Sequence, residues 1–180
     1  MKKLAIALSL VFFAFATKAQ TAAAANNLLS AAYKKAGTEN KNVILIFHAS
    51  WCGWCHKMDS SMNDRNTKQF FDKNYVTVHL TVEESAKNKN LENPGADELK
   101  KKFLGDKAGL PFWVILDKNG KLLADSYIRK PGMSMDVAGE NIGCPASDAE
   151  VAAFLVILKK TSKMNEDQLQ IIEERFKKNK

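Results

Sequence analysis

Two cysteines separated by two residues, Cys52 and Cys55, are the residues of this chain whose spacing most directly implies chemistry. They follow an apolar run over 43–47 and precede a helix-compatible stretch that begins near Gly53. At the start of a helix, backbone N–H groups and the positive end of the helix dipole stabilise a thiolate. The second thiol lies one turn deeper, within reach of the first, so a disulfide can form and open reversibly. The pair therefore predicts a redox centre.

Three other interpretations of the pair stay open. Cys52, Cys55 and His56 match the C-x-x-C-H pattern of c-type haem attachment, although that site does not call for a buried strand before the first cysteine. A zinc site needs two more ligands, and the remaining candidates form no second pair: Cys144, His48, His56 and His79. A stapling disulfide is the third, although a bridge closing so short a loop removes little chain entropy.

The first residues have the pattern of a secretory signal peptide. Lys2 and Lys3 form a positively charged start, and the apolar residues 4–16 are too few to span a bilayer as a helix. Thr17-Lys18-Ala19 then offers a small-x-small cleavage site. We predict a signal peptide over 1–19, bacterial-type export to the periplasm or the exterior, and no stable membrane insertion.

The rest of the chain, residues 20–180, is long enough for one domain with a full core. The formal net charge is +7, and the basic residues are scattered along the sequence. We interpret short runs such as Lys100-Lys101-Lys102 as solvated helix faces, so nucleic-acid binding is not expected.

Hydrophobic periodicity predicts an alternation of helices and strands. Apolar and β-branched runs predict strands over 43–49, 75–82, 112–116 and 121–127. Helical patterns are expected over 22–35, 53–72, 96–103, 147–160 and 165–178. An Asn-Gly turn within 117–120 favours a hairpin between the last two strands. The order predicts an α/β fold: a mixed central sheet with a C-terminal antiparallel hairpin, helices on both faces and an extra C-terminal helix.

These residues resemble the thioredoxin superfamily, in the form of its exported thiol–disulfide oxidoreductases. The resemblance rests on Ala49-Ser50-Trp51-Cys52-Gly53-Trp54-Cys55 after a strand, on Gly109-Leu110-Pro111 before a hairpin, and on an upstream helix over 23–35. In that family the proline of the second motif is cis and faces the cysteine pair. The resemblance implies a thioredoxin-like core over about 23–160, followed by the helix over 165–178.

The resemblance also implies a role for each matching residue. Cys52 would be the exposed nucleophile with a low pKa, and Cys55 the buried resolving thiol. The substrate would contact five residues around the pair: Trp51, Gly53, Trp54, Leu110 and Pro111. No cofactor or metal is implied besides the redox-active disulfide. The expected partners are proteins that carry a disulfide or dithiol, and a membrane thiol protein that donates electrons.

The chain departs from the cytoplasmic members of the family at two places. Their buried aspartate, which assists the resolving thiol, is Ile46 here, so the proton would leave through water, Glu83 or Glu84. The dipeptide Gly-Trp between the cysteines lacks the histidine that makes related pairs oxidising. We therefore expect a reductase, with oxidase or isomerase activity as the alternative. A non-catalytic module that binds copper or unfolded chains is a further alternative. His56, if charged, could tune the thiolates.

The third cysteine, Cys144, lies in a long segment over 129–146 that is rich in glycine, methionine and polar residues. We hypothesise that this insertion flanks the cysteine pair, and that Met133, Met135 and Cys144 shape a substrate groove. The alternative is a buried, inert cysteine.

Overall fold

The computed structural model describes residues 22–180, and the predicted signal peptide over 1–19 lies outside them. The described chain contains both helices and strands. In order, they are α1 (Ala25–Glu39), β1 (Asn42–His48), α2 (Gly53–Met62), α3 (Lys68–Asn74), β2 (Tyr75–Thr81), the 3-10 helix η1 (Ala86–Leu91), α4 (Ala96–Lys102), β3 (Phe112–Leu116), β4 (Leu122–Asp125), β5 (Tyr127–Ile128), β6 (Glu140–Asn141), α5 (Asp148–Thr161), α6 (Glu166–Phe176) and the 3-10 helix η2 (Lys177–Asn179).

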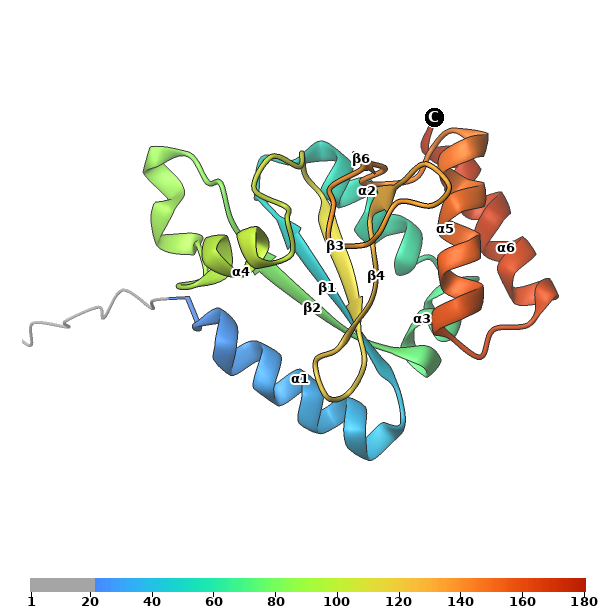
Figure 1. Ribbon diagram of the computed structural model, residues 1–180, viewed down its shortest axis with the longest axis horizontal. Coiled ribbons are helices and arrows are strands. Elements are labelled where there is room, and N and C mark those ends of the chain that lie inside the picture. Colours follow the sequence, from blue (N-terminus) through green and yellow to red (C-terminus); the bar gives the residue numbers. More distant parts are fainter. Residues whose placement is uncertain (1–21) are drawn as a thin grey trace, which may run out of the picture.

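A four-stranded sheet forms the centre of the molecule, in the order β2-β1-β3-β4 (Figure 1). The strand β1 is parallel to β2 and antiparallel to β3, and β3 is antiparallel to β4. Residues 43–47 of β1 are all buried because helices cover both faces of the sheet. The predicted mixed sheet with a C-terminal antiparallel hairpin is confirmed.

Alternate residues of β1 point to opposite faces of the sheet and enter two separate cores. Val43, Leu45 and Phe47 belong to the core shared with α1 and α4, which lie on one side of the sheet in Figure 1. Ile44 and Ile46 belong to the core shared with α2, α3, α5 and α6 on the other side. The extra C-terminal helix α6 adds three buried apolar side chains to this second core.

Two helix boundaries differ from the expected ones. The helix predicted over 53–72 is two helices, α2 and α3, and in the turn between them the Thr67 hydroxyl donates to the Ser61 carbonyl (2.6 Å). The first helix continues through Gly37 and ends at Glu39, and its C-cap residue Asn40 has a φ of 50°, in the left-handed region. Asparagine tolerates that region better than most residues, so it stops the helix where glycine was expected to.

The strand predicted over 121–127 is also divided. The hydroxyl of Ser126 accepts from the Trp113 N–H (3.3 Å) and donates to the Asn141 side chain (2.6 Å). The chain leaves the central sheet at this residue and continues as β5, which pairs with β6 in a small two-stranded sheet. The insertion over 129–146 therefore begins directly after β5 and contains β6, its partner in this small sheet.

The two long C-terminal helices begin where their capping residues predict. Ser147 and Glu150 form a reciprocal capping box at the start of α5, and Asn165 and Gln168 form another at the start of α6. Within residues 22–180, no helix has the length and apolar character needed to cross a membrane.

Candidate active site

The cysteine pair lies at the junction of β1 and α2. Cys52 is the N-cap residue of α2, and its sulfur accepts a hydrogen bond from the Cys55 N–H (3.1 Å). The two sulfurs form a disulfide with a length of 2.01 Å. When the bond opens, the same N–H and the helix dipole would stabilise negative charge on Cys52, as the sequence predicts.

Cys52 is more enclosed than expected. It is 3% exposed and Cys55 is 2% exposed, so the expectation of an exposed Cys52 is wrong for this disulfide form. Both cysteines pack with Ala49, and the side chain of Leu110 lies against this small cluster. Leu110 precedes Pro111 through a cis peptide bond, so a segment distant in sequence covers the pair.

Glu84 holds the turn before the pair. One carboxylate oxygen accepts from the Ser50 N–H (2.5 Å) and the other from the Ser50 hydroxyl (2.8 Å). The Glu84 residue is buried, and these hydrogen bonds, the one from the Ser50 N–H first, hold its pKa below the ordinary value. Glu84 thus holds the turn at Ser50 in place, and both of its carboxylate oxygens are engaged in hydrogen bonds.

Glu83 connects two loops of the site. Its backbone carbonyl accepts from the Trp51 indole N–H (2.9 Å), and its carboxylate accepts from the Lys100 ammonium (2.5 Å). Lys100 also donates to the carbonyl of Ala108 (2.9 Å), just before the Leu110 segment. The side chain of Lys100 is only 2% exposed, so the interpretation of this lysine as solvated was wrong. The cause is the ion pair, which sequence patterning does not reveal.

The segment before the cis proline presents an open backbone edge. Asn141 of β6 donates through its side-chain amide to the carbonyls of Gly109 (2.8 Å) and Pro111 (3.3 Å). Between them, the N–H and the carbonyl of Leu110 have no hydrogen-bond partner within residues 22–180. An extended polypeptide could therefore pair with Leu110 beside the disulfide.

Two tryptophans flank the pair at the surface. Trp51 is 60% exposed and Trp54 is 48% exposed, which is unusual for side chains of this size. The Lys57 ammonium lies 4.2 Å from the centre of the Trp54 ring. Gly53, the first residue of α2, is exposed, and a Cβ atom there would meet no atom within 4 Å beyond its chain neighbours and its own helix backbone.

The three histidines are held by polar partners. The Nε2 atom of His56, in the first turn of α2, lies 3.0 Å from the Ser50 carbonyl, so the ring supports the turn before the pair. His79 contacts the carboxylate of Asp59 (2.7 Å), and its ring packs edge-on against His48 (5.2 Å between centroids). Burial, and then the neighbouring His79, lower the pKa of His48.

His79 and Asp59 lie near Ile46, the position at which cytoplasmic members of the family carry a buried aspartate. Ile46 is the register partner of His79 on the adjacent strand β2. Asp59 follows Cys55 by one helical turn, on the same helix. Sequence reasoning did not connect these residues, although the spacing of Asp59 from Cys55 was a visible signal.

Cys144 is buried and lies near the site. Burial raises the pKa of its thiol to about 12, and the Asn179 side-chain amide donates to its sulfur (3.4 Å). Cys144 also lines a pocket of about 290 Å³ together with Trp54 and Leu110. The insertion therefore flanks the pair, as hypothesised. Met135 instead lines a separate hollow with Phe103 and other residues, and the exposed Met133 lines neither pocket.

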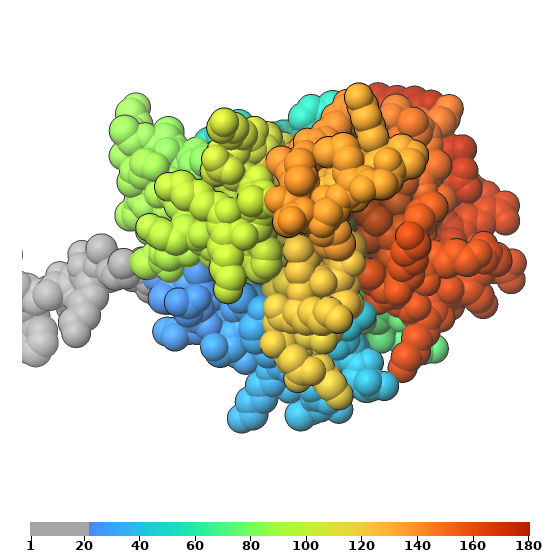
Figure 2. Space-filling view, in the orientation of Figure 1, coloured from blue at the N-terminus to red at the C-terminus, as the bar shows by residue number. Residues whose placement is uncertain are grey.

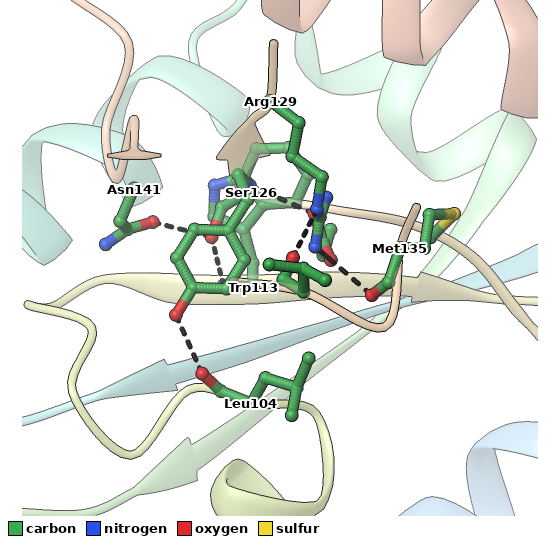
Figure 3. A network of polar contacts seen from close by, with 9 residues as sticks. Leu104, Trp113, Ser126, Arg129, Met135 and Asn141 are labelled. Carbon is green, nitrogen blue, oxygen red and sulfur yellow. Dashed lines mark hydrogen bonds and ion pairs between the residues drawn. The ribbon is translucent and has the colours of Figure 1, made fainter. Parts of the chain in front are cut away.

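The insertion is anchored by a network at its base (Figure 3). Arg129 donates to both carboxylate oxygens of Asp125 (2.7 and 2.6 Å) and to the carbonyl of Val137 (2.6 Å). The Tyr127 hydroxyl donates to the Leu104 carbonyl (2.8 Å). Figure 2 shows the insertion, in orange, packed at the surface beside the yellow-green segment that precedes β3. The insertion is thus a fixed wall of the site.

A metal site requires ligand side chains that lie close together. Within residues 22–180, no group of three or more His, Cys, Asp or Glu side chains is arranged to hold a metal ion. The cysteines available for chemistry at the site are the Cys52–Cys55 pair, because Cys144 is held as a buried thiol.

An α/β fold of this topology, with a C-x-x-C disulfide at a helix start beside a cis proline, defines a thiol–disulfide oxidoreductase of the thioredoxin class. The family model described as thioredoxin-like matches residues 24–118. This is more than half of the chain, so the chain belongs to the thioredoxin-like family.

Three solved structures show partial similarity to this chain. A disulphide isomerase from Xylella fastidiosa Temecula1 is 24% identical over 66% of this chain and 80% of its own, with a TM-score of 0.46. A DsbH oxidoreductase is 26% identical over 71% and 79% of the two chains, with a TM-score of 0.40. The C-terminal domain of DsbD from Neisseria meningitidis is 18% identical over 67% and 88%, with a TM-score of 0.41. No curated protein sequence matches this chain. The assignment therefore rests on the family model.

Proposed function

We propose that this protein is an exported reductase of protein disulfides. The Cys52 thiolate of the reduced protein attacks one sulfur of a substrate disulfide, and the other substrate sulfur leaves as a thiolate. Cys55 then attacks the mixed disulfide at the Cys52 sulfur. The substrate gains two electrons, and the pair is oxidised to the Cys52–Cys55 disulfide. A membrane thiol protein would return the pair to the dithiol state.

One observation carries the proposal: the sulfur of Cys52 is the N-cap of α2 and accepts from the Cys55 N–H. This position favours the thiolate, which is the nucleophile in exchange. The unpaired backbone of Leu110 supplies an adjacent edge for an extended substrate. The absence of histidine from the Gly-Trp dipeptide favours the reducing direction.

The proton of Cys55 must leave during the second attack. The carboxylate of Glu83 is bound to Lys100, and both oxygens of Glu84 are bound to Ser50. Glu84 would have to break these contacts before it could accept a proton, and Glu83 has one oxygen engaged by Lys100. We infer that the proton passes to water.

The proposal is tested with single variants of the pair. Reduced Cys55→Ser protein should trap a disulfide substrate as a mixed disulfide at Cys52, detected as a mass increase that a reductant removes. Cys52→Ser should neither trap nor reduce the substrate. Wild-type protein alkylated after reduction is the matched chemical control. Wild-type protein that turns over no disulfide, but retains Cu(I) after dialysis, would replace the reductase proposal with a copper-binding one.

A further inference from the structure

The pocket beside the disulfide has walls from three separated segments. Trp54 comes from α2, Leu110 from the segment before the cis proline, and Ile142 and Cys144 from the insertion. The remaining side of the pocket includes Glu150, in the first turn of α5. With a volume of about 290 Å³, the pocket is large enough for one long side chain and too small for a globular surface.

The walls combine polar and apolar surface, and the polar side chain of Asn141 is fully engaged. Asn141 uses its amide N–H groups on the carbonyls of Gly109 and Pro111, and its oxygen accepts from Ser126 and from the Gly143 N–H. Asn141 therefore shapes the wall and contributes little polar recognition of its own.

Glu150 is the exception among the lining residues. Its Oε2 atom accepts from the N–H groups of Ala146 (3.1 Å) and Ser147 (2.9 Å), whereas its Oε1 atom has no hydrogen-bond partner in the described chain. No lysine, arginine or histidine within residues 22–180 forms an ion pair with Glu150. Burial, the largest single effect, raises the pKa of this carboxyl, but the hydrogen bonds from Ser147 and Ala146 together outweigh it, so the pKa lies below the ordinary value and the group is negative at neutral pH. Glu150 thus brings to the pocket a negative charge that forms no ion pair within residues 22–180, while Lys57 and Arg175 act on the neighbouring Cys144 from outside the lining.

We propose that this pocket binds a lysine or arginine side chain that adjoins the reactive cysteine of the substrate polypeptide. The aliphatic stem would pack on Trp54, Leu110 and Ile142, and the cationic group would reach Oε1 of Glu150. Pairing of the substrate backbone with Leu110 brings its neighbouring side chains to the pocket mouth. The inference rests on the proposed function, and it makes the protein selective for basic sequences around a disulfide.

The test uses full-length mature protein with the Cys55→Ser substitution, which retains mixed disulfides at Cys52. Short peptides with one cysteine carry lysine, norleucine or glutamate on either side of it. Two peptides compete for Cys52 at equilibrium, and mass spectrometry gives the ratio of the two mixed disulfides. A charged neighbour also changes the pKa of the peptide cysteine itself. Because this effect is the same for every protein variant, the ratios are compared between variants.

Two further substitutions are made in the Cys55→Ser protein. Glu150→Gln removes the charge but keeps an oxygen that can accept from Ala146 and Ser147, so α5 stays capped. Asp148→Asn is the matched control, because it removes a charge from the same helical turn, outside the pocket. We expect the lysine peptide to be favoured over norleucine by about three- to tenfold. This preference should disappear in Glu150→Gln, persist in Asp148→Asn and weaken in 1 M salt.

The outcomes separate this inference from the proposed function. Mixed disulfides that form equally with all peptides, or a lysine preference that is unchanged in Glu150→Gln, overturn the inference and leave the reductase intact. The absence of a mixed disulfide with every peptide overturns the proposed function and the inference together.

Discussion

The ion pair between Lys100 and Glu83 joins the loops on both sides of the disulfide, and the structure predicts an unequal cost for removing its two members. The Lys100 side chain is 2% exposed, whereas the Glu83 side chain is 42% exposed. If Glu83 is replaced by alanine, the buried ammonium keeps only the carbonyl of Ala108 as a partner. If Lys100 is replaced by methionine, the remaining carboxylate can be hydrated, and the apolar stem still packs against Gly105.

The expected magnitudes follow from this asymmetry. Loss of one partner from a fully buried ion pair costs about 3–5 kcal/mol, and a hydrogen bond to a charged group contributes about 1.5–3 kcal/mol. Because Glu83 is half exposed, we expect Glu83→Ala to lower the free energy of unfolding by about 2–3 kcal/mol. Lys100→Met should lower it by about 1–2 kcal/mol. The double variant should resemble Lys100→Met, which gives a coupling energy of about 2–3 kcal/mol, equal to the cost of Glu83→Ala alone.

Urea unfolding of the oxidised protein at pH 7, followed by tryptophan fluorescence, measures these differences. Glu173→Ala is the control, because it removes an exposed ion pair with Lys177 and should change stability by less than about 0.5 kcal/mol. If Glu83→Ala matches this control, or if Lys100→Met is the more damaging change, the reasoning about the buried ammonium is refuted.

Three further predictions concern other parts of the structure. Burial raises the pKa of the Cys144 thiol to about 12. Iodoacetamide at pH 8 should therefore label Cys52 in the reduced folded protein and leave Cys144 unlabelled. Equal labelling rates for the two cysteines would contradict the burial of Cys144. Folding lowers the pKa of Glu84, so the stabilisation from this carboxylate is present above the ordinary value of 4.5 and is lost as the pH falls through the folded value. Glu84→Gln should therefore lower the free energy of unfolding at pH 7 and make it depend less on pH in the acid range. Curves of unfolding free energy against pH that run parallel for the variant and the wild type would contradict this. Ser147→Ala should lower the free energy of unfolding by about 1 kcal/mol through loss of the α5 cap, with an unchanged value counting against the capping box.

Local signals in the sequence predicted much of the fold. The strand β1, the Asn-Gly hairpin and the capping residues Ser147 and Asn165 each depend on a few adjacent residues, and each lies where it was expected. The break between α2 and α3 depends on the side chain of Thr67, and the end of the hairpin depends on Ser126. These side-chain hydrogen bonds override the periodicity that predicted longer elements.

The sequence predicted the positions of the two cysteines, but it did not predict most of the contacts that surround them. The position of Cys52 at a helix start follows from sequence spacing, but its enclosure depends on Leu110, which is distant in sequence. Lys100 stands in a run of lysines that looks solvated, and only its contact with Glu83 distinguishes it. Asn141 gives no sequence signal, because its role comes from the approach of β6 to the cis-proline segment.

The most direct test of the central claim is the reduction potential of the Cys52–Cys55 pair. The mature protein is equilibrated in graded glutathione buffers, the free thiols are alkylated, and the products are counted by mass. The account predicts that both cysteines react together, with a potential near or below about −250 mV. A value of about −180 to −120 mV would contradict the reductase direction and favour an oxidase or isomerase. A pair that neither opens nor closes across the whole range would contradict the redox function itself.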